Sequence, residues 1–333
     1  MVKVLHHDKC FDGACSASLF TRFYRECVDA QAEFRYGGLS HTAAGVVDPA
    51  LLDGDENAIV DFKYAASPKL TWWFDHHLSA FPTPEDSAAF EHYVAEVETG
   101  AVARQQKFFD PNFISCTGYI AEIASTRFGM DVKPLKDLIY WANIVDGAKY
   151  ESADAAVGMR EPAMQLTMVI ESSPDNTLVG RLIPLLTEMP LSDVLQQNFV
   201  QEQLGPLLER HRQGIELIRD RAFLQQGVVS FDILDQPTEA YSKFIPYYLY
   251  PEATYAVGLS RSSARVKVSV GTSPWTTQPL DDLANIATIC QRYGGGGHAR
   301  VGAISFEPGD VEAARTAAGE IIAELRGGGE AAG

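Results

Sequence analysis

Several features that mark other protein classes are missing from this sequence of 333 residues. No apolar run approaches the roughly 20 residues that a membrane span needs, so a membrane location is not expected. The N-terminus, MVKVLHHDKC, turns polar after a few residues and lacks the apolar region of a signal peptide, so we expect it to form the first strand of the fold. The five cysteines are odd in number and form no Cys-x-x-Cys pair, which favours a reduced, cytoplasmic compartment.

Positive charge is also scarce, because 27 Lys and Arg residues stand against 44 Asp and Glu residues and the formal net charge is −17. Such a balance disfavours a protein that coats long nucleic acid through its overall field. It leaves room for a small phosphorylated ligand, since a local basic pocket or a bound metal ion can override the global field.

The first half of the chain alternates short apolar runs with stretches of helical spacing. Residues 14–28 have the spacing of a helix. Strands are expected at residues 2–5, 32–36, 58–62 and 70–74. Strand, helix and strand in succession predict an α/β fold with a parallel sheet. In such sheets ligands bind beyond the carboxyl ends of the strands.

A second, smaller α/β domain is expected in the C-terminal part. Residues 117–226 have mainly helical spacing and are interpreted as a helical segment that caps the first sheet. A change of composition at 225–227 is followed by strands near 228–234, 253–260 and 264–270 and a helix near 280–293. We therefore expect domains at 1–226 and 227–326, with a small, polar and disordered tail at 327–333.

Carboxylate and imidazole side chains follow the predicted strands of the first domain. Asp12 lies just beyond the first strand, and Asp61 ends a later apolar run. Asp75-His76-His77 ends the next one, and Asp146 ends a further apolar stretch. Charged groups in such places are costly unless they are paired or bind a metal ion. Together they predict a shared site for divalent ions, for which Mn²⁺ and Mg²⁺ suit this mixture of oxygen and nitrogen ligands.

A glycine-rich stretch near the C-terminus predicts a different kind of site. Residues 294–297 are four consecutive glycines, followed by His298 and Arg300. Glycines let backbone N–H groups approach an anion closely. Residues 260–300 hold five Lys and Arg residues against two Asp residues, so this part of an acidic protein is locally basic.

Four motifs in order carry a family resemblance: HHDKCFDGACSA, VDF, DHHLSAF and GGGGHARVGAISF. Together they resemble the DHH phosphoesterase superfamily, and more narrowly its DHH/DHHA1 branch, which includes the RecJ-type exonucleases and the oligoribonuclease or pAp-phosphatase-type enzymes. The resemblance covers roughly residues 1–150 and 228–310. It implies a two-metal hydrolase of two α/β domains with the active site in the cleft between them.

The resemblance also implies roles for individual residues. The implied metal ligands are His6, Cys10, Asp12, Asp61, His76 and Asp146. Asp61 would bridge the two ions, His77 would face the scissile phosphate, and Asp75 would orient its neighbours. The implied substrate-binding residues are Arg261, Gly295, Gly296, Gly297, His298 and Arg300.

Cys10 stands where many relatives have an aspartate, and three interpretations are open. A thiolate ligand would favour a softer ion such as Zn²⁺ or Fe²⁺ over Mg²⁺. Alternatively, Cys10 is a spectator and Asp8 or His7 fills the position, or the first metal site is only weakly occupied. A shift of one residue in the strand register would also make His7, in place of His6, the metal ligand. The expected cofactor is two Mn²⁺ ions, with Mg²⁺, Zn²⁺, Fe²⁺ and Co²⁺ left open by Cys10.

The resemblance and the residues together predict a metal-dependent phosphoesterase that uses a metal-activated water. The expected substrates are short single-stranded oligonucleotides or small nucleotides such as pAp and linear or cyclic dinucleotides. One alternative is a pyrophosphatase or exopolyphosphatase, although relatives of that kind usually have a different, Lys/Arg-rich second domain. Another is a non-catalytic nucleotide-binding regulator with a degenerate site, an alternative suggested only by Cys10. No membrane partner is expected, and a homodimer is allowed.

Overall fold

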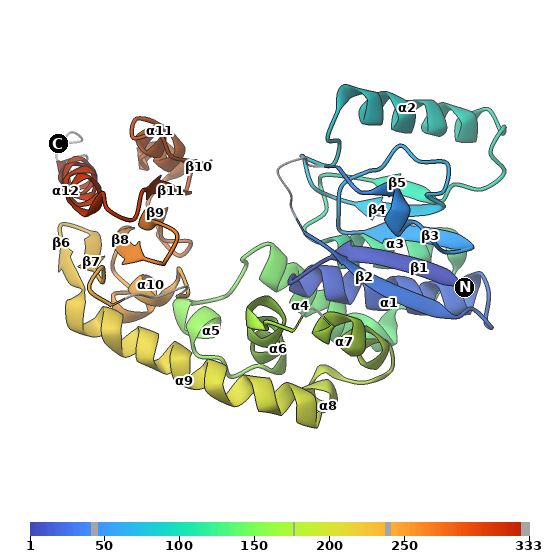
Figure 1. Cartoon of the computed structure of the whole chain (residues 1–333), viewed down its shortest axis with the longest axis horizontal. Helices are drawn as coiled ribbons and strands as arrows, with labels where there is room; N and C mark the ends of the chain where they lie inside the picture. Colours follow the sequence, from blue (N-terminus) through green and yellow to red (C-terminus); the bar gives the residue numbers. More distant parts are fainter. Residues whose placement is uncertain (41–45, 176, 237–240, 328–333) are drawn as a thin grey trace. The chain divides into compact units, whose positions relative to one another are not determined.

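The computed structural model describes residues 1–40, 46–175, 177–236 and 241–327. The chain forms two compact units (Figure 1). Unit 1 contains Met1–Tyr150 and Arg160–Leu207, and unit 2 contains Glu151–Met159 and the chain from Leu208 onward. The division at Leu207 falls inside helix α9, Asn198–Arg221, which therefore contributes to both units. Of the tail expected at 327–333, Gly327 is the last residue of a helix and 328–333 lie outside the described residues.

Unit 1 is built on a parallel sheet of five strands in the order β2-β1-β3-β4-β5. The strands are β1 Val2–His7, β2 Phe34–Leu39, β3 Glu56–Val60, β4 Trp72–Asp75 and β5 Lys107–Phe109. Every pair of neighbours in this sheet is parallel, as the sequence predicts. The strands β1, β3 and β4 are adjacent, so their carboxyl ends meet at the same edge of the sheet.

Helices cover both faces of this sheet. The helices of unit 1 are α1 Phe11–Cys27, α2 Pro84–Glu98, α3 Cys116–Phe128, α4 Lys136–Asp146, α6 Pro162–Ser172, α7 Leu178–Glu188 and α8 Leu191–Leu195, with short 3₁₀ turns at Pro49–Leu51 and Lys133–Leu135. Two neighbouring residues of β4 show the two faces, because side chains alternate along a strand. Trp72 contacts Phe23 of α1 at 5.5 Å between ring centroids, and Trp73 contacts Phe90 of α2 at 5.2 Å. Both tryptophans are fully buried, so they serve packing.

Unit 2 contains a mixed sheet of six strands in the order β10-β11-β9-β8-β7-β6. The strands are β6 Phe223–Gln225, β7 Val228–Asp232, β8 Tyr255–Arg261, β9 Val266–Thr272, β10 Gly296–His298 and β11 Val301–Phe306. Only the β7–β8 pair is parallel. The helices are α5 Ala153–Val157, α10 Ile245–Leu249, α11 Ile286–Gln291 and α12 Val311–Gly327, with a 3₁₀ turn at Leu280–Asp282. This is the second α/β domain expected from the sequence.

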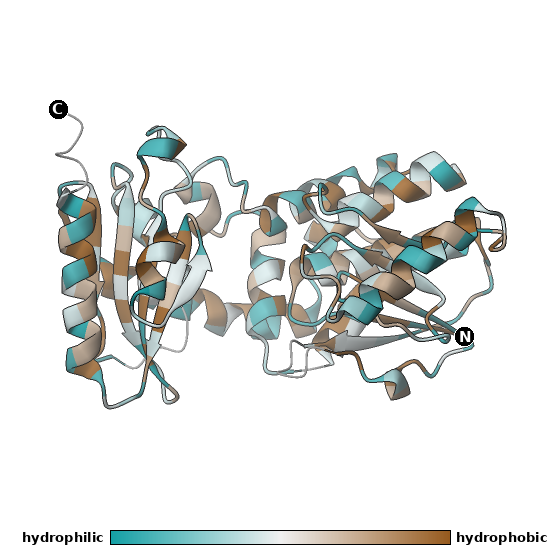
Figure 2. Ribbon diagram, turned by 90° about the horizontal axis from the view of Figure 1, so that it is seen from above, coloured by the Kyte–Doolittle hydropathy of each residue, from teal (hydrophilic) through white to brown (hydrophobic). Residues whose placement is uncertain are grey.

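The core of unit 2 lies between one face of the sheet and helices α11 and α12. Val257, Val268 and Ile304 come from three neighbouring strands and pack with Ile321 of α12. Apolar and polar residues alternate along α12, the helix that leads to the C-terminus in Figure 2, which is typical of a helix with one buried side. Among the helices of the described residues, none has the length and apolar character needed to cross a membrane.

Candidate metal centre

Polar side chains converge where three neighbouring strands of unit 1 end. His7 is the last residue of β1, Asp61 directly follows β3, and Asp75 ends β4 with His76 next in the chain. The Nε2 atom of His76 lies 3.5 Å from Oδ1 of Asp61, and Nδ1 of His7 lies 3.5 Å from its Oδ2. The parallel order of the strands explains this meeting, because it places all three carboxyl ends at one edge.

Two further carboxylates reach the same place from helices. Asp12 lies in the first turn of α1, and its oxygens accept hydrogen bonds from the backbone N–H groups of Cys116, at 2.7 Å, and Thr117, at 3.1 Å. These donors belong to the first turn of α3, so the helix end holds the Asp12 carboxylate in a fixed orientation. Asp146 is the last residue of α4, and its Oδ2 lies 3.5 Å from Nε2 of His76.

Three sets of side chains have potential ligand atoms within 4.8 Å of one another. The sets are His7, Cys10 and Asp61; Asp61, His76 and His77; and Asp12, His76 and Asp146. Asp61 and His76 each belong to two of them. A carboxylate that belongs to two neighbouring ligand sets can bridge a pair of divalent ions about 3.5–4 Å apart.

Asp61 stands out as a buried carboxylate without hydrogen bonds. Its side chain is 1% exposed, and neither of its oxygens has a hydrogen-bond partner. Its φ of 56° lies in the left-handed region, which a residue with a side chain seldom adopts. The Nε2 atom of His76 is likewise buried without a hydrogen bond. Burying such groups unsatisfied costs several kcal/mol. The donor atoms therefore fit divalent cations, which would satisfy them.

The charges of the cluster perturb one another strongly. Burial, together with the Asp61 charge, raises the pKa of Asp146 to about 6 and also raises the pKa of Asp12. Burial alone would lower the pKa of His76, but the carboxylates around it raise that pKa to about 9. Burial would raise the pKa of Asp61, but the nearby imidazoles of His7 and His76 hold it below its ordinary range. The cluster thus carries crowded negative charge that a cation would neutralise.

Asp75 orients the two histidines that follow it. It is fully buried, and its Oδ1 accepts hydrogen bonds from the backbone N–H of His76, at 2.8 Å, and from Nδ1 of His77, at 2.7 Å. The Nδ1 atom of His76 lies 3.1 Å from the carbonyl oxygen of Phe113. A carbonyl can only accept, so Nδ1 of His76 carries a proton, and Nε2 becomes available to a ligand when it gives up its own proton. The bond from Asp75 raises the pKa of His77.

The structure groups His7, and not His6, with Cys10 and Asp61. The two histidines are successive strand residues and point in opposite directions. His6 is 1% exposed, and its Nδ1 lies 3.0 Å from the carbonyl oxygen of His7. The family resemblance implies His6 as the ligand, and the strand register left open an exchange with His7. The signal that distinguishes them is that His7 ends the strand.

The thiol of Cys10 lies beside the cluster, at the residue that precedes α1. Burial raises its pKa, and the charges of Asp61 and Asp12 raise it further, so the thiolate needs a cation to form. Asp8 does not enter any of the ligand sets within the described residues. Its side chain packs over Gly38, where an added Cβ would lie 2.6 Å from Cγ of Asp8.

The glycine-rich loop lies in unit 2, where β10 pairs with β11. Gly297 has a φ of 151°, and a Cβ there would come within 2.2 Å of the carbonyl oxygen of Val301, so the position requires glycine. Gly295 is similarly tight, since a Cβ would lie 2.4 Å from the carbonyl oxygen of Ala303. His298 is exposed, and Nη2 of Arg300 donates to the carbonyl oxygen of Ser273 at 2.6 Å.

Arg261 lies apart from that loop. His298 pairs with Val301, which pairs with Gly271, which in turn pairs with Ala256 of β8. Arg261 is five residues further along β8, about 17 Å at the rise of a strand. Because side chains alternate, it also belongs to the opposite face of the sheet from Ala256. The structure thus brings together the loop residues and leaves Arg261 outside their group.

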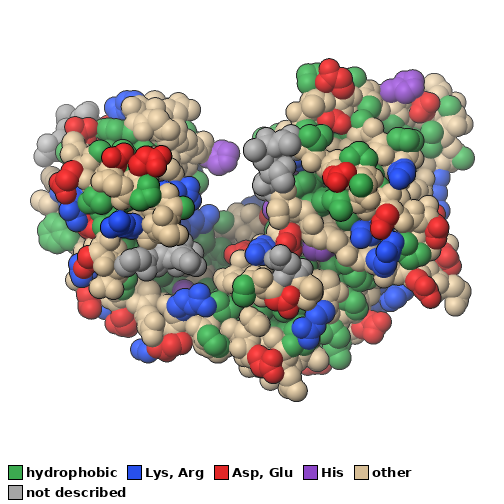
Figure 3. All heavy atoms as spheres, in the orientation of Figure 1, with side chains coloured by type: hydrophobic (Ala, Val, Ile, Leu, Met, Phe, Trp, Pro, Cys, Tyr) green, Lys and Arg blue, Asp and Glu red, His purple; other side chains and the backbone are tan. Residues whose placement is uncertain are grey.

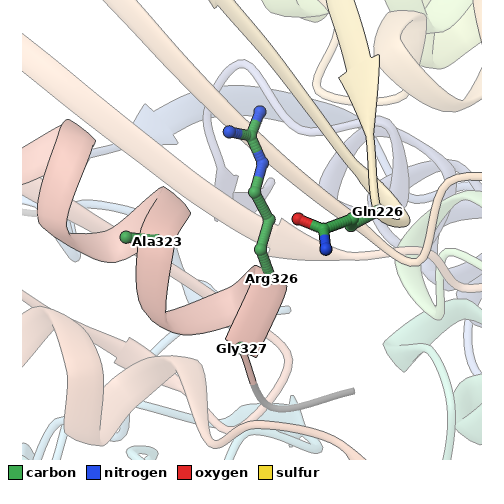
Figure 4. Close-up of a pocket in the computed structure, with 4 residues that line it drawn as sticks. All are labelled: Gln226, Ala323, Arg326 and Gly327. Atoms are coloured by element: carbon green, nitrogen blue, oxygen red, sulfur yellow. The ribbon is translucent and has the colours of Figure 1, made fainter. Parts of the chain in front are cut away.

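Two surface features lie apart from these groups. A pocket in unit 2 is lined by Gln226, Ala323, Arg326 and Gly327, and none of these is a predicted site residue (Figure 4). On the face drawn in Figure 3, acidic and basic side chains are interspersed over both units. Neither feature adds a group to the cluster at the end of β1, β3 and β4.

Solved structures of similar fold were found, whereas no protein-family model and no curated protein matches the sequence. A pGpG-specific phosphodiesterase, PggH from Vibrio cholerae, has a TM-score of 0.68 at 18% identity, covering 97% of this chain and 99% of that one. The DHH domain of a protein described as a member of a ribosomal-protein family has a TM-score of 0.52 at 14% identity, covering 98% and 87%. An exopolyphosphatase-related protein from Bacteroides fragilis has a TM-score of 0.50 at 14% identity, covering 98% and 92%.

These likenesses extend over nearly the whole chain and include both units. They agree with the parallel sheet of unit 1 and the mixed sheet of unit 2. The chain therefore has the two-domain α/β fold of the DHH phosphoesterases.

Proposed function

We propose that this protein is a metal-dependent phosphoesterase that hydrolyses phosphodiester or phosphomonoester bonds of small nucleotides or short oligonucleotides. The observation that carries the proposal is Asp61, a buried carboxylate without hydrogen bonds that two neighbouring ligand sets share. The first ion would be held by His7, Cys10 and Asp61, and the second by Asp12, Asp61, His76 and Asp146. Bound divalent ions supply an acidified water and neutralise charge on a phosphoryl group.

The histidine pair gives the chain its own part in this chemistry. With its pKa raised by Asp75, His77 holds a proton over a wider pH range than a free histidine. Its Nδ1 is engaged by Asp75, which leaves Nε2 to donate a hydrogen bond to a phosphoryl oxygen or to the leaving group. In unit 2, the loop at Gly295–His298 and Arg300 would bind an anionic group of the substrate, and Arg261 is outside that group.

Short linear dinucleotides are the first substrates to test. PggH, to which this chain is similar in fold over nearly the full length of both proteins, is described as specific for pGpG. The acidic net charge of −17 also disfavours long nucleic acid. We also propose that the protein binds two Mn²⁺ ions, forms a homodimer and acts in the cytoplasm.

The direct test is hydrolysis by the purified chain loaded with Mn²⁺. pGpG, pAp, a cyclic dinucleotide and pyrophosphate are incubated separately, and the products are separated by chromatography. Hydrolysis of at least one nucleotide is expected, with a loss of at least 10²-fold in Asp61→Asn. Asp137→Asn is the matched control, because Asp137 is an exposed carboxylate of α4 outside the cluster. Phosphate release from pyrophosphate alone would favour the phosphoanhydride alternative, and binding without turnover would favour a regulator.

A further inference from the structure

The described residues cover one face of the sheet in unit 2 only in part. On the β7–β8 side, Phe231 fills the space over Gly258, and Tyr247 of α10 packs with Ala256 and Val229. On the β9–β11 side the hydroxyl of Tyr241 lies near Ser269 and that of Tyr247 lies over Gly271, but the residues that line this part of the face stay partly or fully exposed. These are Lys267, Ser269 and Gly271 of β9 and Val301, Ala303 and Ser305 of β11.

Two cationic side chains lie together at one end of this face, and a third is within electrostatic reach of them. Lys267 pairs with Ser305 across the strands, and Nη1 of Arg265 donates to the Ser305 hydroxyl at 3.1 Å. Lys243 comes from the segment that precedes α10. Burial lowers the pKa of Lys267, and the charges of Arg265 and Lys243 lower it further, which places the three cations within electrostatic reach of one another.

These cations have no acidic partners among the described residues, unlike other arginines of the same unit. Arg221 is paired with Asp235, and Arg315 with Asp232 and Glu312. By contrast, no described carboxylate lies within ion-pair distance of Lys243, Arg265 or Lys267. Like charges repel, so a group of three cations that no described carboxylate neutralises, beside a hydroxyl, is suited to binding an anion.

We propose that Lys243, Arg265 and Lys267, with the Ser305 hydroxyl, bind the terminal phosphomonoester of a small nucleotide. A phosphate dianion offers several acceptor oxygens, which matches three cationic donors and a hydroxyl better than a single carboxylate would. The cluster, here called the lysine-arginine cluster, contains none of the residues that the family resemblance implies for substrate binding.

The lysine-arginine cluster and His298 lie on the same face of the sheet but at different positions along it. His298 is level with Gly271, and Lys267 is four residues away along β9, or about 13 Å. A linear dinucleotide with a terminal phosphate carries two separated anionic groups, so it offers one group to each of two positions. This assignment of the ligand rests on the proposed function, because it takes the substrate to be a nucleotide.

The experiment compares two dinucleotides that differ only in the 5′-phosphate. Both carry a non-hydrolysable bridging phosphonate, and each is titrated calorimetrically into the full-length chain loaded with Mn²⁺. The unaltered chain is expected to bind the 5′-phosphorylated form at least 10-fold more tightly than the 5′-hydroxyl form. In the double variant Lys243→Gln, Lys267→Gln, this preference is expected to fall to about 2-fold or less, while the affinity for the 5′-hydroxyl form stays within 2-fold.

Two further variants separate the cluster from its surroundings. Arg210→Gln removes an exposed positive charge of unit 2 on α9 and is expected to keep the preference. His298→Ala is expected to weaken both ligands by a similar factor. The proposal is overturned if the unaltered chain shows no preference or no binding, if the double variant keeps the preference, or if it weakens both forms equally. Hydrolysis is measured separately, so a chain that prefers the phosphorylated ligand without cleaving any substrate would contradict only the proposed function.

Discussion

Asp61 and His76 lie with a carboxylate oxygen and a ring nitrogen 3.5 Å apart, yet neither atom makes a hydrogen bond. Both side chains are less than a tenth exposed. Two buried, complementary groups that both lack a hydrogen bond indicate a third partner that contacts both of them. We interpret this relationship as the sign of a metal centre, and the following predictions depend on it.

Removing the charge of Asp146 should stabilise the metal-free protein. The pKa of Asp146 is raised to about 6, so at pH 8 its ionised form opposes folding. The expected gain in the free energy of unfolding for Asp146→Asn is about 1–2 kcal/mol, reduced because the side chain is 23% exposed. The same variant should lose most of the stabilisation that Mn²⁺ gives the unaltered chain. Urea unfolding at pH 8 with EDTA or Mn²⁺ measures both effects, and equal metal stabilisation in the two proteins would refute the ligand role of Asp146.

Metal binding should strengthen as the pH rises. Before the ion binds, His76 has a pKa of about 9 and Asp146 one of about 6, and both must give up their protons. The dissociation constant for Mn²⁺ should therefore fall steadily between pH 6 and pH 9, with protons released on binding. Calorimetry in two buffers of different ionisation enthalpy counts these protons. A dissociation constant independent of pH over this range would contradict the arrangement.

The link between Asp75 and His77 should matter for turnover and not for metal content. Asp75→Asn removes the carboxylate that raises the pKa of His77, so the alkaline limb of the pH–rate profile should move to lower pH. The rate at neutral pH should fall by about 10²–10⁴-fold, the range typical of proton transfer by a positioned side chain. Bound manganese, measured by elemental analysis, should be unchanged. If manganese is lost with activity, Asp75 acts on the ions and not through His77.

A hydrogen-bonded link between two helices should tune the affinity of the second ion. Ser115, which caps α3, donates its hydroxyl to Oδ1 of Asn143 at 2.8 Å, and Asn143 lies on α4 one turn before Asp146. The same α3 end holds Asp12. Asn143→Ala should weaken Mn²⁺ binding by about 10-fold, as loss of outer-sphere support does in metal sites. Asp137→Asn, on the same helix, should leave the affinity unchanged; equal effects of the two variants would exclude a positioning role for Asn143.

The convergence of the main carboxylates was predictable because it follows from topology. Asp61 and the Asp75-His76-His77 triplet end adjacent parallel strands, and any such strands bring their carboxyl ends together. The parallel sheet and the two-domain α/β architecture follow from the same periodic patterns in the sequence.

The features of the site that could not be predicted from the sequence depend on the orientation of single residues. The choice between His6 and His7 turns on where β1 ends, and element boundaries are set by tertiary packing. Arg261 belongs to the opposite face from His298, which only the register of β8, β9 and β11 shows. Lys243 and Lys267 of the lysine-arginine cluster are 24 positions apart in the sequence, and no local pattern links them.

Anomalous scattering from a crystal of the Mn²⁺-loaded protein tests the central claim most directly. We expect two manganese peaks about 3.5–4 Å apart on either side of the Asp61 carboxylate. One peak should contact His7 and Cys10, and the other Asp12, His76 and Asp146. Manganese absent from the ends of β1, β3 and β4, or bound without contact to Asp61, would contradict it.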